Sequence, residues 1–267
     1  MESSPTKLMT TVAIMICVDH GQISIDDDIT PILPDLCALL VLDGVRSEGQ
    51  CLIKPRAKSI TLRLLISHQS GCGYHPSPRL ARWARQNGKT NSVFDNDFEG
   101  MKTYPLFFEL GEGWTIARIN NTTLEEFMRS NIWEPLVRHG LSDLLSRVAP
   151  RHDGPPRQMY DRIDDKGLER GAWLSQIPAQ HNCGGPGPWS TPRDWTKFLG
   201  MVLADRGSIL SKASIDQISN AQTIGSNDLQ ELLTGPLCAS LRSKVDMDAG
   251  RIGLISEFEM AVYAEFT

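Results

Sequence analysis

The first twenty residues carry the densest apolar run of the chain. Apolar side chains recur at helical spacing from Leu8 to Val18, so the pattern predicts a helix over residues 4–20. His20 would lie in the last turn and Gly21 just beyond it, which is typical of a helix C-terminus.

Five further segments predict helices, and most of them begin with a helix-start signal. Serine and threonine accept hydrogen bonds from the free first-turn amides, and a proline at the first position needs no donor. The predicted helices are 60–66 with Thr61 as cap, 78–87 around Trp83, 121–135 ended by Pro135, 191–206 with Thr191 as cap and Pro192 first, and a short helix after Ser211.

Strand signals are weaker than helix signals. Short alternating or apolar stretches predict strands over residues 22–25 and 39–42, followed by a loop as far as residue 58. The stretch 150–182 is rich in proline, glycine and charge, which predicts loop or short strands. No internal repeat divides the chain.

Composition narrows the function classes. The chain has 267 residues, 40% of them apolar, which is enough for one large domain or two small ones. The net charge of −5 argues against binding to nucleic acid or to an anionic membrane. No apolar run reaches transmembrane length and no signal-peptide pattern opens the chain, so a cytoplasmic location is expected. The six scattered cysteines are interpreted as reduced thiols.

The segment Ser4-Pro5-Thr6-Lys7 is the candidate catalytic site. On a helix, Ser4 and Lys7 would lie one turn apart on the same face. A serine hydroxyl becomes a good nucleophile when a neighbouring base takes its proton, and a lysine can be that base. The plain alternative is a serine cap followed by a surface lysine. Asp26-Asp27-Asp28 has a similar pair of interpretations, a metal site or solvated turn residues, and the second is favoured.

Four segments together resemble the serine β-lactamase-related family of class C β-lactamases, DD-peptidases, esterases and acyltransferases. Residues 4–10 resemble its nucleophile helix, and residues 21–28 resemble the connection that follows it. Residues 60–71 resemble its segment I-T-L-R-H-L-L-T-H-T-S-G. Residues 184–198 resemble its segment G-G-x-x-S-T-P-R-D-x-x-K-F. In detail the sequence is most similar to the fungal branch of the family, which contains transesterases.

The resemblance implies an α+β, β-lactamase/transpeptidase-like fold in a single domain over residues 1–267. It also implies acyl transfer from a small-molecule acyl donor to an alcohol acceptor, or ester hydrolysis, in fungal secondary metabolism. Ser4 would form the acyl-enzyme, Lys7 would be the base, and Trp114 and Trp189 would border the cleft. The family mechanism needs no cofactor and no metal.

This chain departs from the family pattern in three places. The family's tyrosine motif is absent after Trp114, the C-terminal Lys-Thr-Gly or His-x-Gly strand is absent, and three residues precede Ser4. We therefore expect an incomplete antiparallel sheet beside a better-formed helical region. Tyr74 or Tyr104 could replace the missing tyrosine or could simply pack. An inactive remnant or binding module, and a β-lactam hydrolase, are the alternative functions.

Overall fold

The computed structural model describes residues 5–67, 69–70, 78–89, 104–106, 119–138, 160–162, 167–171, 192–203, 209–220 and 222. Within them the helices are α1 (Pro5–Asp19), α2 (Pro34–Cys37), α3 (Leu62–Ile66), α4 (Pro78–Gln86), α7 (Leu124–Met128), the π-helix η2 (Arg129–Trp133), α8 (Glu134–Arg138), α9 (Pro192–Leu203) and α10 (Lys212–Ser219). The strands are β1 (Val41–Val45), β2 (Cys51–Lys54), β3 (Tyr160–Arg162) and β4 (Leu168–Arg170).

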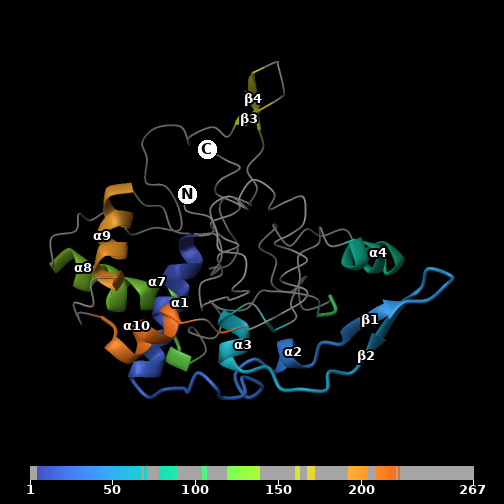
Figure 1. Cartoon of the computed structure of the whole chain (residues 1–267), viewed down its shortest axis with the longest axis horizontal. Coiled ribbons are helices and arrows are strands. Elements are labelled where there is room, and N and C mark those ends of the chain that lie inside the picture. Colours follow the sequence, from blue (N-terminus) through green and yellow to red (C-terminus); the bar gives the residue numbers. More distant parts are fainter. Residues whose placement is uncertain are drawn as a thin grey trace.

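Helix α1 lies in the core and is buried on all sides. Thr6 and every residue from Leu8 to Cys17 are buried. The sequence correctly predicted this helix but suggested a single apolar face. The difference arises because α7, η2 and α10 all contact α1. Residues on every side of its central turns are buried as a result. Helices α7 and α10 lie beside α1 in Figure 1.

The C-terminus of α1 is closed as its sequence predicts. Gly21 has a φ of +66°, a backbone conformation that glycine adopts without steric cost. Its N–H donates to the Val18 carbonyl at 2.9 Å, and the Gln22 N–H donates to the Cys17 carbonyl at 3.0 Å. This pair of bonds is a Schellman motif, which satisfies carbonyls that the helix itself leaves open.

One apolar cluster joins the N-terminal and C-terminal parts of the chain. Its most deeply buried large side chains come from α1, α3, the α7–η2 segment and α9, with Ile29 between them. They are Met9, Ile14, Met15, Ile29, Leu62, Leu65, Ile66, Met128, Ile132 and Phe198. Helix α1 contributes the longest continuous share of this cluster. Helices α7 and α10 lie beside it (Figure 1).

The helix predicted over residues 121–135 starts at Leu124, after the cap Thr123, and does not end as predicted. Thr123 accepts a hydrogen bond from the Glu126 N–H, and the Glu126 carboxylate accepts one from the Thr123 N–H, which forms a capping box. The prediction that Pro135 closes the helix was wrong, since α8 continues to Arg138. The π-helical turn η2 ends at Trp133, two residues before Pro135. A π-helical turn is wider than a regular one, which leaves room for a proline ring that would crowd a regular helix.

Three other predicted helix starts agree with the structure. Thr61 caps α3 by accepting from the Leu64 N–H at 3.3 Å, and Ser211 caps α10 by accepting from the Ser214 N–H at 3.2 Å. Helix α9 begins at Pro192 as expected, although its predicted cap Thr191 lies outside the described residues. Among the described residues, no helix is both long and apolar enough to cross a membrane.

The described sheet consists of two separate antiparallel hairpins. Strand β1 pairs with β2, and β3 pairs with β4 (Figure 1). The strand predicted over residues 22–25 was wrong, because this segment forms turns that close α1, and β1 starts two residues after the start predicted for its strand. Strand β2 was missed because it has only four residues, which lie between Gly49-Gln50 and Pro55.

Candidate active site

Of the predicted catalytic pair Ser4 and Lys7, the structure describes only Lys7, which lies in the first turn of α1. The helix begins at Pro5, directly after Ser4, so Lys7 is its third residue. Lys7 is half-buried between the buried side chains of Thr6 and Leu8. Ser4 itself lies outside the described residues, so its distance from Lys7 stays a prediction. First-turn amides of a helix have no partner within it and favour negative charge nearby.

The predicted cleft residues Trp114 and Trp189 also lie outside the described residues. Of the two tyrosines considered as substitutes for the missing motif, only Tyr104 is described. Tyr104 is buried, and its ring centroid lies 5.6 Å from that of Trp83 on α4. The aromatic contact supports a packing role for Tyr104, the alternative considered from the sequence.

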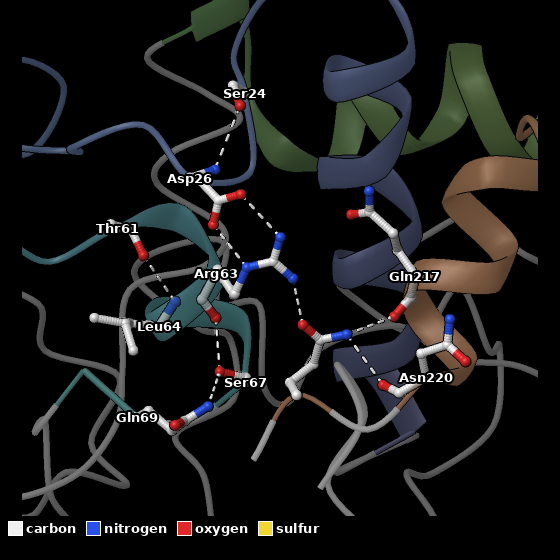
Figure 2. Close-up of polar contacts among 10 residues, drawn as sticks. Ser24, Asp26, Thr61, Arg63, Leu64, Ser67, Gln69, Gln217 and Asn220 are labelled. Carbon is white, nitrogen blue, oxygen red and sulfur yellow. Dashed lines mark hydrogen bonds and ion pairs between the residues drawn. The ribbon is translucent and has the colours of Figure 1, made fainter. Parts of the chain in front are cut away.

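An arginine fork connects two of the family-like segments. Arg63 on α3 donates from Nε to Asp26 Oδ1 at 2.7 Å and from Nη2 to Asp26 Oδ2 at 2.9 Å. Its remaining terminal nitrogen donates to Gln222 Oε1, beyond α10 (Figure 2). The hydrogen bonds between the Arg63 and Asp26 side chains lower the pKa of Asp26 and raise the pKa of Arg63. Sequence reasoning noted both segments but did not pair these two charges, although their opposite signs were a usable signal.

The turn that follows α3 is held by a chain of hydrogen bonds. The Gln69 amide donates to Ser67 Oγ at 2.6 Å, and Ser67 Oγ donates to the Arg63 carbonyl at 2.7 Å (Figure 2). The Gln69 N–H donates to the Leu64 carbonyl at 2.7 Å. Ser70 comes next and is buried. His68, within the same family-like segment, lies outside the described residues.

The acidic triple consists of turn residues, as the favoured interpretation held. Asp27 accepts from the Ser24 N–H at 2.8 Å, and Asp28 accepts from the Thr30 hydroxyl at 2.6 Å. Hydrogen bonds from Thr30 lower the pKa of Asp28. Asp26 differs from a purely solvated residue because it forms the ion pair with Arg63. The part of the chain that is described holds no group of three or more side chains suited to a metal ion.

The far end of α1 is fixed by polar contacts. Asp19 accepts hydrogen bonds from the Ser211 N–H, the Ser211 hydroxyl and the Ser214 hydroxyl, each at 2.7 Å. Burial alone would raise the pKa of Asp19, but these hydrogen bonds outweigh burial and lower it. The Asn120 amide donates to Cys17 Sγ at 3.3 Å. Helix α1 is therefore attached at this end to both α10 and the segment before α7.

Comparisons with known proteins identify the family. The Beta-lactamase family model matches residues 3–234. The lovastatin esterase of Penicillium rubens is 33% identical over 233 residues, which are 81% of this chain and 58% of that protein. The monacolin J acid methylbutanoyltransferase of Aspergillus terreus is 28% identical over 234 residues, which are 81% of this chain and 55% of that protein. The chain thus spans little more than half the length of these relatives.

The fold agrees with the same family. A mutant of simvastatin synthase from Aspergillus terreus superposes with a TM-score of 0.69 at 23% identity, covering 95% of this chain and 63% of that chain. This likeness confirms the expected β-lactamase/transpeptidase-like α+β fold, with a well-formed helical region and small antiparallel hairpins. On the family match and the sequence identity, the chain belongs to the β-lactamase family.

Proposed function

We propose that this protein is a serine acyltransferase or esterase that works through an acyl-enzyme on Ser4. One observation carries the proposal: the Ser-x-x-Lys sequence opens the buried central helix of a β-lactamase-family chain. Ser4 Oγ attacks the carbonyl of an ester or thioester, and neutral Lys7 takes the hydroxyl proton. That proton then passes to the departing alkoxide or thiolate, which leaves an ester on Ser4.

Release of the acyl group is the same reaction in reverse. Water or an alcohol attacks the Ser4 ester and gives its proton to Lys7. Lys7 passes that proton to Ser4 Oγ as the bond between Oγ and the acyl carbon breaks, and an acid or a new ester leaves. The N–H of Ser4 serves as one donor to the tetrahedral oxyanion, and the N-terminal dipole end of α1 favours the same negative charge. Both steps require only protein groups and the two substrates.

The proposed substrates are small esters and alcohols. The relatives from Penicillium rubens and Aspergillus terreus are named an esterase and a methylbutanoyltransferase, which supports a role in fungal secondary metabolism. Trp114 and Trp189 would then border the substrate cleft. We place the protein in the cytoplasm, which is consistent with the free thiols of Cys17 and Cys51 and is checked by cell fractionation.

The test measures acyl-enzyme formation directly. Wild type, Ser4→Ala, Lys7→Ala and the matched control Ser3→Ala are incubated with p-nitrophenyl butyrate and, separately, with a fluorophosphonate probe. Labelling mapped to Ser4, with turnover reduced about 10³-fold or more in Ser4→Ala and Lys7→Ala but not in Ser3→Ala, is expected. Equal turnover in wild type and Ser4→Ala would refute the proposal.

A second candidate is a binding module without catalysis, which the missing tyrosine motif favours. Tyr104, the described tyrosine that was considered as a substitute, packs against Trp83. Binding of the butyrate ester with neither turnover nor labelling would support that candidate. Hydrolysis of nitrocefin at a rate above that of the butyrate ester would instead assign a β-lactamase.

A further inference from the structure

Helix α4 and the hairpin of β1 and β2 form one unit, which comprises residues 41–54 and 78–89. The Gln86 side chain on α4 accepts a hydrogen bond from the Cys51 N–H at 3.1 Å and donates to the Gly49 carbonyl at 2.8 Å. These two bonds attach the helix to the hairpin. In Figure 1 this α4–hairpin unit lies on the side of the molecule away from α9 and α10.

The α4–hairpin unit is basic, although the protein is acidic. The whole chain has 27 basic and 32 acidic residues, whereas this unit has six basic and two acidic ones. Helix α4 contributes three arginines and no acidic residue. The net charge of −5, which argued against an anionic membrane, is an average over the chain and does not describe the local surface.

Several of these cations face water with no carboxylate beside them. The side chains of Arg46, Lys54, Arg82 and Arg85 are all exposed. Lys54 forms an ion pair with Asp43. Within the described part of the chain, no acidic side chain forms an ion pair with any of the three arginines. Three positive charges are therefore available to an anionic surface.

Two exposed apolar side chains lie on one face of the same hairpin. Val45 is 37% exposed and Ile53 is 47% exposed. Val45 pairs with Cys51, and Ile53 lies two residues from Cys51, so the alternation along the strands puts Val45 and Ile53 on the same face. Arg46 and Lys54 directly follow them in the sequence. Cations beside exposed apolar side chains are typical of segments that bind the surface of an anionic membrane.

We propose that the α4–hairpin unit binds the surface of an anionic membrane. Its exposed arginines contact the anionic headgroups, and its two exposed aliphatic side chains enter the boundary between headgroups and acyl chains. These aliphatic side chains favour a membrane over a soluble polyanion, because a soluble polyanion would leave them in water. The binding needs neither residue of the proposed catalytic pair, so it is independent of the proposed acyl transfer.

Vesicle sedimentation tests the proposal on the whole chain. Wild type is mixed at low salt with vesicles of phosphatidylcholine alone and with vesicles that also contain about 30% phosphatidylserine. Wild type should bind only the second kind, and about 0.5 M NaCl should release it because salt screens the charges. Arg82→Glu/Arg85→Glu should weaken binding at least about tenfold, and Ile53→Ser should weaken it about fivefold.

Arg170→Glu/Lys212→Glu is the matched control, because it changes the net charge equally but on β4 and α10, outside the unit. It should bind as wild type does. Measurement of Tm shows that each variant is folded, and Arg82→Gln/Arg85→Gln replaces the charge reversal if that reversal lowers Tm. Absence of wild-type binding to the phosphatidylserine vesicles, or equal losses in the two double variants, overturns the proposal. Retention on immobilised polyglutamate without vesicle binding also overturns it and assigns the basic surface to an acidic protein.

Discussion

Arg63 and Asp26 face each other through two parallel hydrogen bonds of 2.7 and 2.9 Å, although 37 residues separate them in the chain. With the further bond to Gln222, one guanidinium connects the loop after α1, helix α3 and the chain beyond α10. Only the planar arginine fork can make this set of contacts, because a lysine ammonium is a single point charge.

Replacing Arg63 by lysine should therefore destabilise the fold even though the charge is kept. The side chains are 30% and 65% exposed, so solvent screening limits the loss to about 1 kcal/mol in the free energy of unfolding. Urea denaturation checks this value. Lys212→Ala, which breaks the more exposed ion pair with Asp216, is the matched control and should change stability by less than about 0.5 kcal/mol. Equal losses in the free energy of unfolding for the two substitutions would show that the paired hydrogen bonds of Arg63 add no stability beyond that of a simple ion pair.

Acid should release α10 from α1 through Asp19. Burial raises the pKa of this carboxyl, but the hydrogen bonds from Ser211 and Ser214 outweigh burial, so its folded-state pKa lies below the ordinary value. A lowered folded pKa means that the folded state binds fewer protons than the unfolded state. The stabilisation is then fully present above the unfolded pKa of about 3.9 and is lost as pH falls through the lower folded pKa.

Asp19→Asn should consequently cost about 1 kcal/mol at neutral pH and almost nothing in strong acid. Urea unfolding of wild type and variant across the acid range measures the difference between them. A difference that stays constant or grows on acidification would show that the Asp19 carboxylate does not carry this stabilisation.

Two glycines with equally open surroundings should respond in opposite directions to alanine. A Cβ at Gly21 or at Gly200 would meet no atom within 4 Å. Gly21 has a φ of +66°, so Gly21→Ala should lower the free energy of unfolding by about 1 kcal/mol. Gly200 lies inside α9, so Gly200→Ala should raise it by about 0.5–1 kcal/mol. Thermal unfolding of both variants measures the two changes in stability. Since the space around the two glycines is equally open, Tm shifts of the same sign would show that backbone conformation does not decide the outcome.

Cys17 should be chemically inert in the folded protein. It is 1% exposed, and burial is the main reason that the pKa of its thiol is raised, which suppresses the reactive thiolate. Alkylation by iodoacetamide, followed by peptide mass mapping, should be at least about tenfold slower at Cys17 than at half-buried Cys51. The two rates should converge in urea. Equal rates without denaturant would show that α1 opens readily.

Local signals predicted much of the helical structure. Thr61, Pro192 and Ser211 correctly marked the starts of α3, α9 and α10, because capping is a bond between near neighbours and leaves its trace within three residues. Gly21 marked the end of α1 for the same reason. The family, and with it the prediction of Ser4 and Lys7, was likewise readable from short segments, and the match over residues 3–234 confirmed the family.

Other features depended on partners far away in the chain. The sequence could not show that α1 is buried on every side, because that requires α7, η2 and α10 to surround it. Strand β2 exists because β1 pairs with it, and Pro135 lies within a continuing helix because a π-helical turn precedes it. In such cases long-range strand pairing and burial override the secondary-structure propensity of the local sequence.

The sequence alone thus determined the family, the starts of α3, α9 and α10 and the end of α1, and it predicted the catalytic pair, since each depends on neighbouring residues. Only the tertiary structure decided that Arg63 pairs with Asp26, that Asp19 binds the start of α10, and that the Ser70 hydroxyl is buried without a partner. The physical reason is that hydrogen bonding and burial depend on distance in space, which the order of residues does not specify.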